Sequence, residues 1–169
     1  MNSTDKVIES VTYVIKGMVD VFLNSPSPCL YLDASFYCNY FTMLVAVFTD
    51  ANHHVQPMAC HLCGEESGDD YIMLLQSMVD AGMSKKDHIV VVSDHHASIH
   101  RAVIDALSQT SIPYRHIACA EHLKRIIADL VNNDSDSVSQ DYMDIRSYLW
   151  RAQHNGTKEL CEKYLKVNV

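Results

Sequence analysis

The sequence predicts an α/β domain built on a mixed β-sheet, in which a three-strand antiparallel meander precedes parallel strands joined by crossover helices. Two observations support this prediction. First, residues 88–93 are rich in β-branched side chains and lead at once into an amphipathic segment, as expected of a strand buried on both faces. Second, strand-like segments at 29–35, 40–49 and 55–63 follow one another with short polar connections.

The other elements follow from apolar spacing and from residues that end helices. Residues 5–22 carry apolar side chains at helical spacing, so we expect an amphipathic helix that ends near Asn24. In the strand at 55–63, Pro57 predicts an edge position, because proline cannot donate to a strand ladder. Further helices are expected at about 65–82, 96–107, 121–131, 140–153 and 157–167, and a short strand at 114–118.

The order of these elements predicts which strand ends meet. A right-handed crossover would place the strand at 88–93 beside the strand at 29–35 and parallel to it. Each strand is expected to end on an acidic residue, Asp33 in one and Asp94 in the other. Because α/β folds place their chemistry at the carboxyl ends of strands, we expect these two carboxylates side by side at that edge.

Length and composition restrict the class of protein. The 169 residues fit one domain, for which we expect an N-terminal helix and linker at 1–28, a core at 29–131 and a helical segment at 132–169. No apolar run is long enough to span a membrane, and the first residues are too polar for a signal peptide. We therefore expect a nuclear or cytoplasmic protein that is not secreted, contacts no membrane and keeps its thiols reduced.

The net charge of −8 restricts the partners. A self-sufficient DNA-binding domain normally carries a basic patch that neutralises phosphates. Here 13 Lys and Arg stand against 21 Asp and Glu. Any work on nucleic acid would therefore need metal ions, a local basic patch or help from elsewhere.

Asp33 and Asp94 form the first candidate site. Neighbouring carboxylates supply the hard oxygen ligands that divalent cations prefer, and two ions about 4 Å apart would stabilise the attacking and leaving oxygens of a phosphoryl transfer. A turn or a helix cap would explain either residue by itself, but their equivalent positions on neighbouring strands favour the metal site. Glu66, at the start of a helix, complements the helix dipole and could also reach this edge as an accessory ligand.

Cysteine and histidine pairs give two further candidates, both for zinc. Cys119 and His122 lie three residues apart on a predicted helix turn, with His116 as a third candidate ligand. A buried thiol and a backbone-bonded histidine explain this group slightly better. Cys60 and Cys63 have the spacing of a zinc knuckle, but residues three apart on a strand point to opposite faces, so we do not expect them to share an ion.

Several motifs occur in an order that is specific as a whole. The stretches are LDASFYCNYFTMLVAVFTDANHHVQPMACHLCGEES, HIVVVSDHHASIHRAV and YRHIACAEHLKR, within residues 29–131. They include Asp33-Ala-Ser-Phe36, Asp50-x-Asn52, Pro57, Glu66-Ser67, Ser93-Asp94 and Cys119-x-x-His122 preceded by His116. In this order and spacing they resemble the transposase domain of Mutator-like elements (MULE), a branch of the RNase H-like nucleotidyl transferases.

This resemblance implies an RNase H-like fold and the DDE chemistry of DNA transposition, in which two Asp and a distant Glu hold Mg²⁺ or Mn²⁺ for strand cleavage and transfer. Asp33 and Asp94 match the first two positions. The third has no recognisable match, since Glu159 and Glu162 lack the family context. We therefore expect a fragment or a degenerate copy that cleaves little DNA by itself. Transposon-end DNA would be the partner of a complete protein, bound weakly by this acidic chain, and homo-oligomers are a further expectation.

Two alternatives stay open. The chain could be a catalytically inactive, domesticated transposase remnant that acts as a protein-interaction module, which the acidic charge and the unmatched glutamate favour. It could also be a zinc-stabilised structural domain that uses Cys119, His122 and His116.

Overall fold

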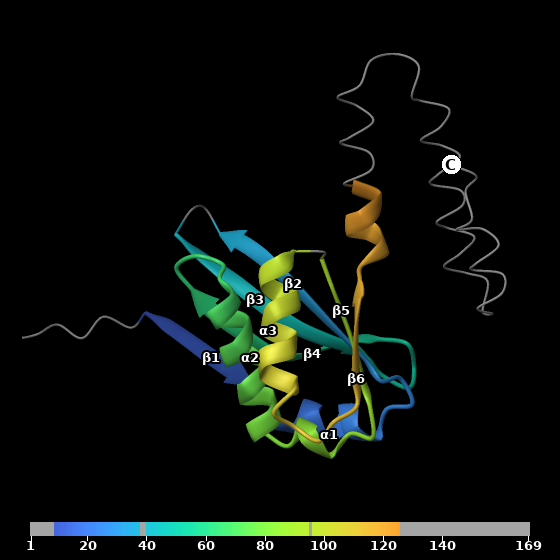
Figure 1. The fold of residues 1–169 in the computed structure, drawn as a ribbon. Helices are drawn as coiled ribbons and strands as arrows, with labels where there is room; N and C mark the ends of the chain where they lie inside the picture. Colours follow the sequence, from blue (N-terminus) through green and yellow to red (C-terminus); the bar gives the residue numbers. More distant parts are fainter. Residues whose placement is uncertain (1–8, 38–39, 95, 126–169) are drawn as a thin grey trace, which may run out of the picture. The chain divides into compact units, whose positions relative to one another are not determined.

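Figure 1 shows the computed structural model of the chain, which describes residues 9–37, 40–94 and 96–125. The chain divides into two compact units, Met1–Ile117 and Ala118–Val169. A mixed six-stranded sheet with helices confirms the predicted α/β class. Its strands are β1 (Ser10–Val14), β2 (Cys29–Tyr37), β3 (Phe41–Thr49), β4 (Val55–Cys63), β5 (Ile89–Ser93) and β6 (Tyr114–Ala118). The helices are α1 (Lys16–Asn24), α2 (Gly68–Asp80), the short 3₁₀ helix η1 (Met83–Lys85) and α3 (Ala97–Leu107).

The strands lie in the order β1-β4-β3-β2-β5-β6. Strands β2, β3 and β4 form the expected antiparallel meander. After β4 the chain passes through α2 and η1 and returns as β5, which pairs in parallel with β2. The predicted crossover, and the parallel neighbour that it brings to the first strand of the meander, are therefore confirmed.

The prediction of one helix over residues 5–22 is wrong for its middle part. Residues Ser10–Val14 form β1, which pairs antiparallel with β4, and the helix α1 begins only at Lys16. The segment alternates polar residues with Val11 and Tyr13, a pattern that suits a half-exposed strand as well as a helix face. On its side away from β3, β4 has backbone N–H and C=O groups that can pair with another strand. Pairing with these groups makes the segment a strand and not part of a helix. The expected helix end at Asn24 is confirmed.

Pro57 does not mark an edge strand, because β4 lies between β1 and β3. Two features make the proline tolerable there. The β3–β4 register shifts beside it, as at a β-bulge, and the pairing with β1 ends at Val14 opposite Ala59, before Pro57 is reached. The last contact on that side is the N–H of Ile15 donating to the carbonyl of Met58 at 2.9 Å. The missing N–H therefore interrupts no β1–β4 pair.

The core lies on one face of the sheet. Along β3 buried and partly exposed residues alternate, and the buried set faces the helices. Phe22 of α1 meets Phe48 of β3 edge to face with ring centroids 5.3 Å apart, and α2 and α3 lie side by side (Figure 1). Each large aliphatic side chain buried in this way contributes about 1.5–3 kcal/mol, so this face supplies most of the stability. It includes Val19, Leu30, Leu44, Leu74, Leu75, Met78, Val91 and Val103.

The second unit is described for only a few residues. A helix runs over residues 120–125, in agreement with the start of the helix expected at 121–131. The helices expected at 140–153 and 157–167, together with Glu159 and Glu162, lie outside the described residues. The segment boundaries expected after residues 28 and 131 stay predictions. Within the described ranges, no helix has the length and apolar character needed to cross a membrane.

Lys86, which is far from α1 in the sequence, binds the backbone carbonyls at the C-terminal end of this helix. Its Nζ donates to the backbone carbonyls of Phe22, Leu23 and Ser25 at 2.9, 3.1 and 2.6 Å, and lies 5.1 Å from the centroid of the Phe22 ring. The last turn of α1 contains no basic residue of its own. A cation at a helix C-terminus satisfies carbonyls that have no partner within the helix and complements the dipole. Burial lowers the pKa of Lys86.

We predict that Lys86→Met lowers the free energy of unfolding by about 1.5–3 kcal/mol, because hydrogen bonds from a charged donor to backbone carbonyls are lost. Urea unfolding of the two proteins measures the difference. The matched control is Lys85→Met, which alters an exposed neighbour and should change stability by less than about 0.5 kcal/mol. Equal effects of the two substitutions would contradict this role.

Candidate functional site

The parallel pairing of β2 and β5 ends two residues before the two predicted aspartates. The register pairs Cys29 with Val90 and Tyr31 with Val92. Continued by two residues, it places Asp33 beside Asp94. Asp94 follows the last residue of β5, as expected. The expectation that Asp33 ends its strand is wrong, because β2 stays paired with β3 as far as Tyr37.

Local hydrogen bonds orient both carboxylates. Asp94 Oδ1 accepts from the N–H of His96 at 3.1 Å, and Asp33 Oδ1 accepts from the N–H of Ala34 at 3.0 Å. The N-cap of α3 is His96, which has no side-chain cap, so neither Ser93 nor Asp94 caps this helix. Asp94 is therefore not the N-cap, but its bond to the N–H of His96 is an Asx turn that leads into α3, and its use as a metal ligand stays a prediction.

The charges of three carboxylates in this region act on one buried tyrosine. Tyr71 of α2 is fully buried and its hydroxyl donates to Glu66 Oε1 at 2.9 Å. Burial raises the pKa of Tyr71 strongly, and the charges of Glu66, Asp94 and Asp33 raise it further. All three carboxylates therefore lie within electrostatic reach of one hydroxyl. Glu66, just before the N-cap of α2, is thus a third acidic side chain in these surroundings.

A chain of hydrogen bonds supports the backbone of Asp94. The hydroxyl of the buried Ser93 donates to the Asp94 carbonyl at 2.8 Å, and its oxygen lies 2.8 Å from His116 Nε2. Since the Ser93 proton is already used, His116 Nε2 must be the donor. In the neutral ring, Nδ1 of His116 then accepts from His100 Nδ1, 3.0 Å away, and the two rings are stacked. This chain connects β5, β6 and α3 next to Asp94.

The predicted zinc group consists of His116, Cys119 and His122, all within the described residues. His116 has the contacts with Ser93 and His100 just given, which sequence reasoning did not anticipate. Cys119 is a half-buried free thiol directly before the helix at 120–125, and its carbonyl accepts from the N–H of Leu123 at 3.0 Å. Zinc binding by Cys119 and His122 stays a prediction.

The two thiols of Cys60-His-Leu-Cys63 lie on opposite faces of β4, as expected. Cys63 is buried on the helix-covered face, with His61, whereas Cys60 is half-buried on the other. Among the described residues, His61, Cys63 and Asp70 bring one ligand atom each within 4.8 Å of one another. Sequence reasoning missed this group because it tested only the cysteine pair. The signal was available, since His-x-Cys on a strand shares a face.

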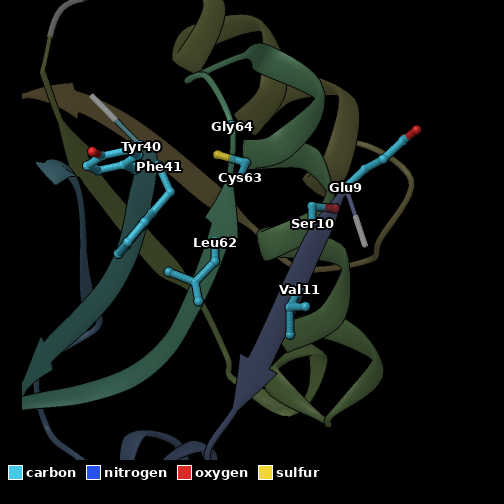
Figure 2. Close-up of a pocket in the computed structure, with 8 residues that line it drawn as sticks. All are labelled: Glu9, Ser10, Val11, Tyr40, Phe41, Leu62, Cys63 and Gly64. Atoms are coloured by element: carbon cyan, nitrogen blue, oxygen red, sulfur yellow. The ribbon is translucent and has the colours of Figure 1, made fainter. Parts of the chain in front are cut away.

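A shallow pocket of about 300 Å³ lies at the end of β4 next to β1 (Figure 2). Figure 2 shows that its walls are the side chains of β1, β4 and the start of β3, with the Cys63 sulfur at one rim. The lining residues are Glu9, Ser10, Val11, Tyr40, Phe41, Leu62, Cys63 and Gly64. This lining is largely apolar and includes none of the residues predicted for a catalytic site.

Comparison with known proteins gives two similarities. The profile of the MULE transposase domain matches residues 29–126. Protein FAR1-RELATED SEQUENCE 4 of Arabidopsis thaliana is 28% identical over 124 residues, which make up 72% of this chain and 16% of that relative. The chain therefore corresponds to a small part of the curated relative that it matches.

Tyr71 should make stability fall in alkaline solution. The folded state holds the Tyr71 proton more tightly than the unfolded state, so the resulting stabilisation is complete below about pH 10 and is lost as the pH rises above it. Between pH 10 and 11 the parent protein should lose about 1 kcal/mol more than Tyr71→Phe, which cannot ionise. Urea unfolding at both pH values measures this. Tyr13→Phe, at a side chain that is 63% exposed, should behave like the parent. A parallel fall in all three proteins would contradict the prediction.

Proposed function

Because the chain belongs to the MULE transposase domain family, we propose that its mixed sheet is an RNase H-like core in which Asp33 and Asp94 form the divalent-metal site of a transposase-derived domain. The observation that carries this proposal is the parallel register of β2 and β5, which, continued two residues past the pair Tyr31–Val92, would bring Asp33 level with Asp94. Both residues belong to the part of the chain that matches the family. In a complete protein the function of this core would be DNA strand cleavage and transfer.

The residues around the pair suit Mg²⁺ or Mn²⁺. Carboxylate oxygens are the hard ligands that these ions take, and Glu66 adds a third carboxylate within reach of the same buried hydroxyl. Three acidic groups that raise the pKa of one tyrosine create the negative potential that attracts a cation. A bound Mg²⁺ or Mn²⁺ would supply charge stabilisation for attack on a phosphodiester.

The side chains of this domain would then have separate tasks. Asp33 and Asp94 would hold the ion, each with its carboxylate oriented by a backbone N–H. Ser93 and His116 would keep the Asp94 backbone in place, because their hydrogen bonds meet at its carbonyl and at the buried Ser93 hydroxyl. Tyr71, through its bond to Glu66, would hold that carboxylate at the start of α2. We expect these supporting residues to affect metal affinity.

The isolated chain is proposed to cleave little or no DNA. The glutamates that stand nearest to the family's third position in sequence, Glu159 and Glu162, lie outside the described residues and lack the family context. The net charge of −8 opposes binding to phosphates. Catalysis and tight binding of transposon-end DNA would therefore depend on parts of a longer protein.

We predict that Mn²⁺ raises the midpoint of thermal unfolding of the parent protein and that Asp94→Asn and Asp33→Asn abolish the rise. A ligand that binds only the folded state at about ten times its Kd adds about 1.4 kcal/mol, or about 3–6 °C for a chain of this size. Differential scanning fluorimetry in chelator-treated buffer measures the shift.

Asp87→Asn is the matched control, because Asp87 is an exposed acid just before β5, whereas Asp94 follows its end. This variant should keep the full Mn²⁺ shift. A shift of the same size in Asp94→Asn would place the bound ion elsewhere and refute the two-aspartate site.

The apolar side chains exposed around the pocket of Figure 2 favour a second function. In this function the chain is a domesticated module through which copies of the chain associate. Tyr40 is 84% exposed, and Val11, Phe41 and Leu62 are also exposed. An acidic chain with an apolar patch suits protein contacts better than contacts with phosphates.

Sedimentation velocity over a wide concentration range tests the module. If copies associate through this patch, Tyr40→Glu should shift the protein toward monomer. Glu substitution of the exposed Met73, on α2, is the control and should leave the distribution unchanged. A parent protein that stays monomeric at all concentrations would exclude self-association as its function.

A further inference from the structure

We propose that His61, Cys63 and Asp70 form a zinc site that is separate from the aspartate pair. Their ligand atoms all lie within 4.8 Å of one another, at the junction of β4 with the first turn of α2. The His61 side chain is fully buried, Cys63 is 5% exposed and the Asp70 side chain is 16% exposed. Three side chains with different ligand atoms thus converge at a buried position. Burying such polar groups without a partner would cost free energy.

Two independent local structures create this convergence. His61 and Cys63 are alternate residues of β4, so both point to the face covered by helices. Asp70 is positioned by the N-cap of α2: Ser67 Oγ accepts from the Asp70 N–H at 3.3 Å and donates to Asp70 Oδ2 at 2.5 Å. Strand alternation and helix capping therefore hold the ligands in place without a metal ion.

The second nitrogen of His61 is fixed in the way that metal-bound imidazoles usually are. Thr12 Oγ1 of β1 lies 2.7 Å from Nδ1, while Nε2 lies 2.9 Å from Asp70 Oδ1. Without a metal ion, Nε2–H donates to the ionised Asp70 and Nδ1 accepts from Thr12. With zinc on Nε2, the ring proton moves to Nδ1 and Thr12 becomes the acceptor. A hydroxyl can serve in either direction, so the contact survives binding.

The charge of the site also favours a divalent cation. Burial, followed by the charges of Asp70 and Glu66, raises the pKa of the Cys63 thiol to about 11. In the metal-free protein this thiol donates to the carbonyl of Thr42, with sulfur and oxygen 3.7 Å apart. The nearby carboxylates of Asp70 and Glu66 attract a cation. When zinc binds, a Zn–S bond replaces the S–H bond and one proton passes to solvent, which leaves Zn²⁺ balanced by a thiolate and a carboxylate.

The mixture of ligands identifies the class of metal. One imidazole nitrogen, one thiolate and one carboxylate suit tetrahedral Zn²⁺, with water in the fourth position, rather than Mg²⁺ or Mn²⁺, which prefer oxygen alone. Cys63 lines the pocket of Figure 2, which gives the ion an approach from solvent. The bound ion would join β4 to α2, and Thr12 would extend the connection to β1. The site therefore acts on the fold and does not depend on the proposed transposase chemistry.

Cobalt substitution of the full chain tests the site. Co²⁺ bound to a thiolate gives a sulfur-to-metal charge-transfer band in the near ultraviolet, and zinc should abolish it by displacement. We expect this band in the parent protein and its loss in Cys63→Ser. Cys60→Ser is the matched control, because it alters a thiol of the same strand on the opposite face, and it should keep the band.

Asp70→Asn provides a second test at a more exposed position, in case Cys63→Ser does not fold. It should weaken cobalt and zinc binding by at least about tenfold. Absence of the band in the parent would overturn the proposal. So would a band that persists in Cys63→Ser but disappears in Cys119→Ser, which would assign the metal to the Cys119–His122 pair. Asp94→Asn should leave the band intact, so failure of the aspartate site and failure of the zinc site are distinguishable.

Discussion

The parallel hydrogen-bond ladder between β2 and β5 is the interaction on which the rest of the structure depends. It joins the antiparallel meander to the crossover half of the sheet, and its register, continued two residues past the pair Tyr31–Val92, would bring Asp33 level with Asp94. A shift by one residue would turn one of these side chains to the other face and break the apolar face shared by Leu30 and Val91. The packing of the core therefore protects the alignment of the two carboxylates.

The start of α2 is the second organising point, because it faces both candidate sites. Ser67 caps the helix and orients Asp70 toward His61, while Glu66 bonds to Tyr71 in the surroundings of the aspartates. Hard carboxylate oxygens on one side and a mixed imidazole, thiolate and carboxylate set on the other would select different ions. In the two proposals, one helix terminus positions acidic residues for two chemically distinct purposes.

Much of the fold could be predicted because its signals are local. The meander, the crossover and the strand at Tyr114–Ala118 follow from runs of β-branched residues and from short turns. Two errors came from non-local effects. Residues Ser10–Val14 form a strand only because β4 offers an unpaired ladder, and Pro57 is tolerated in an inner strand only because a register shift and the end of β1 coincide there.

The sequence by itself determined the family and the α/β class, and it predicted the two aspartates as a site, since these depend on motifs and on periodicity along the chain. Only the tertiary structure decided which side chains meet across elements. Strand alternation alone could place His61 with Cys63, but Asp70 and Tyr71 come from α2 and Thr12 comes from β1. Their meeting depends on how α2 and β1 pack against β4. Packing is fixed by buried surface over the whole core, which no single stretch of sequence contains.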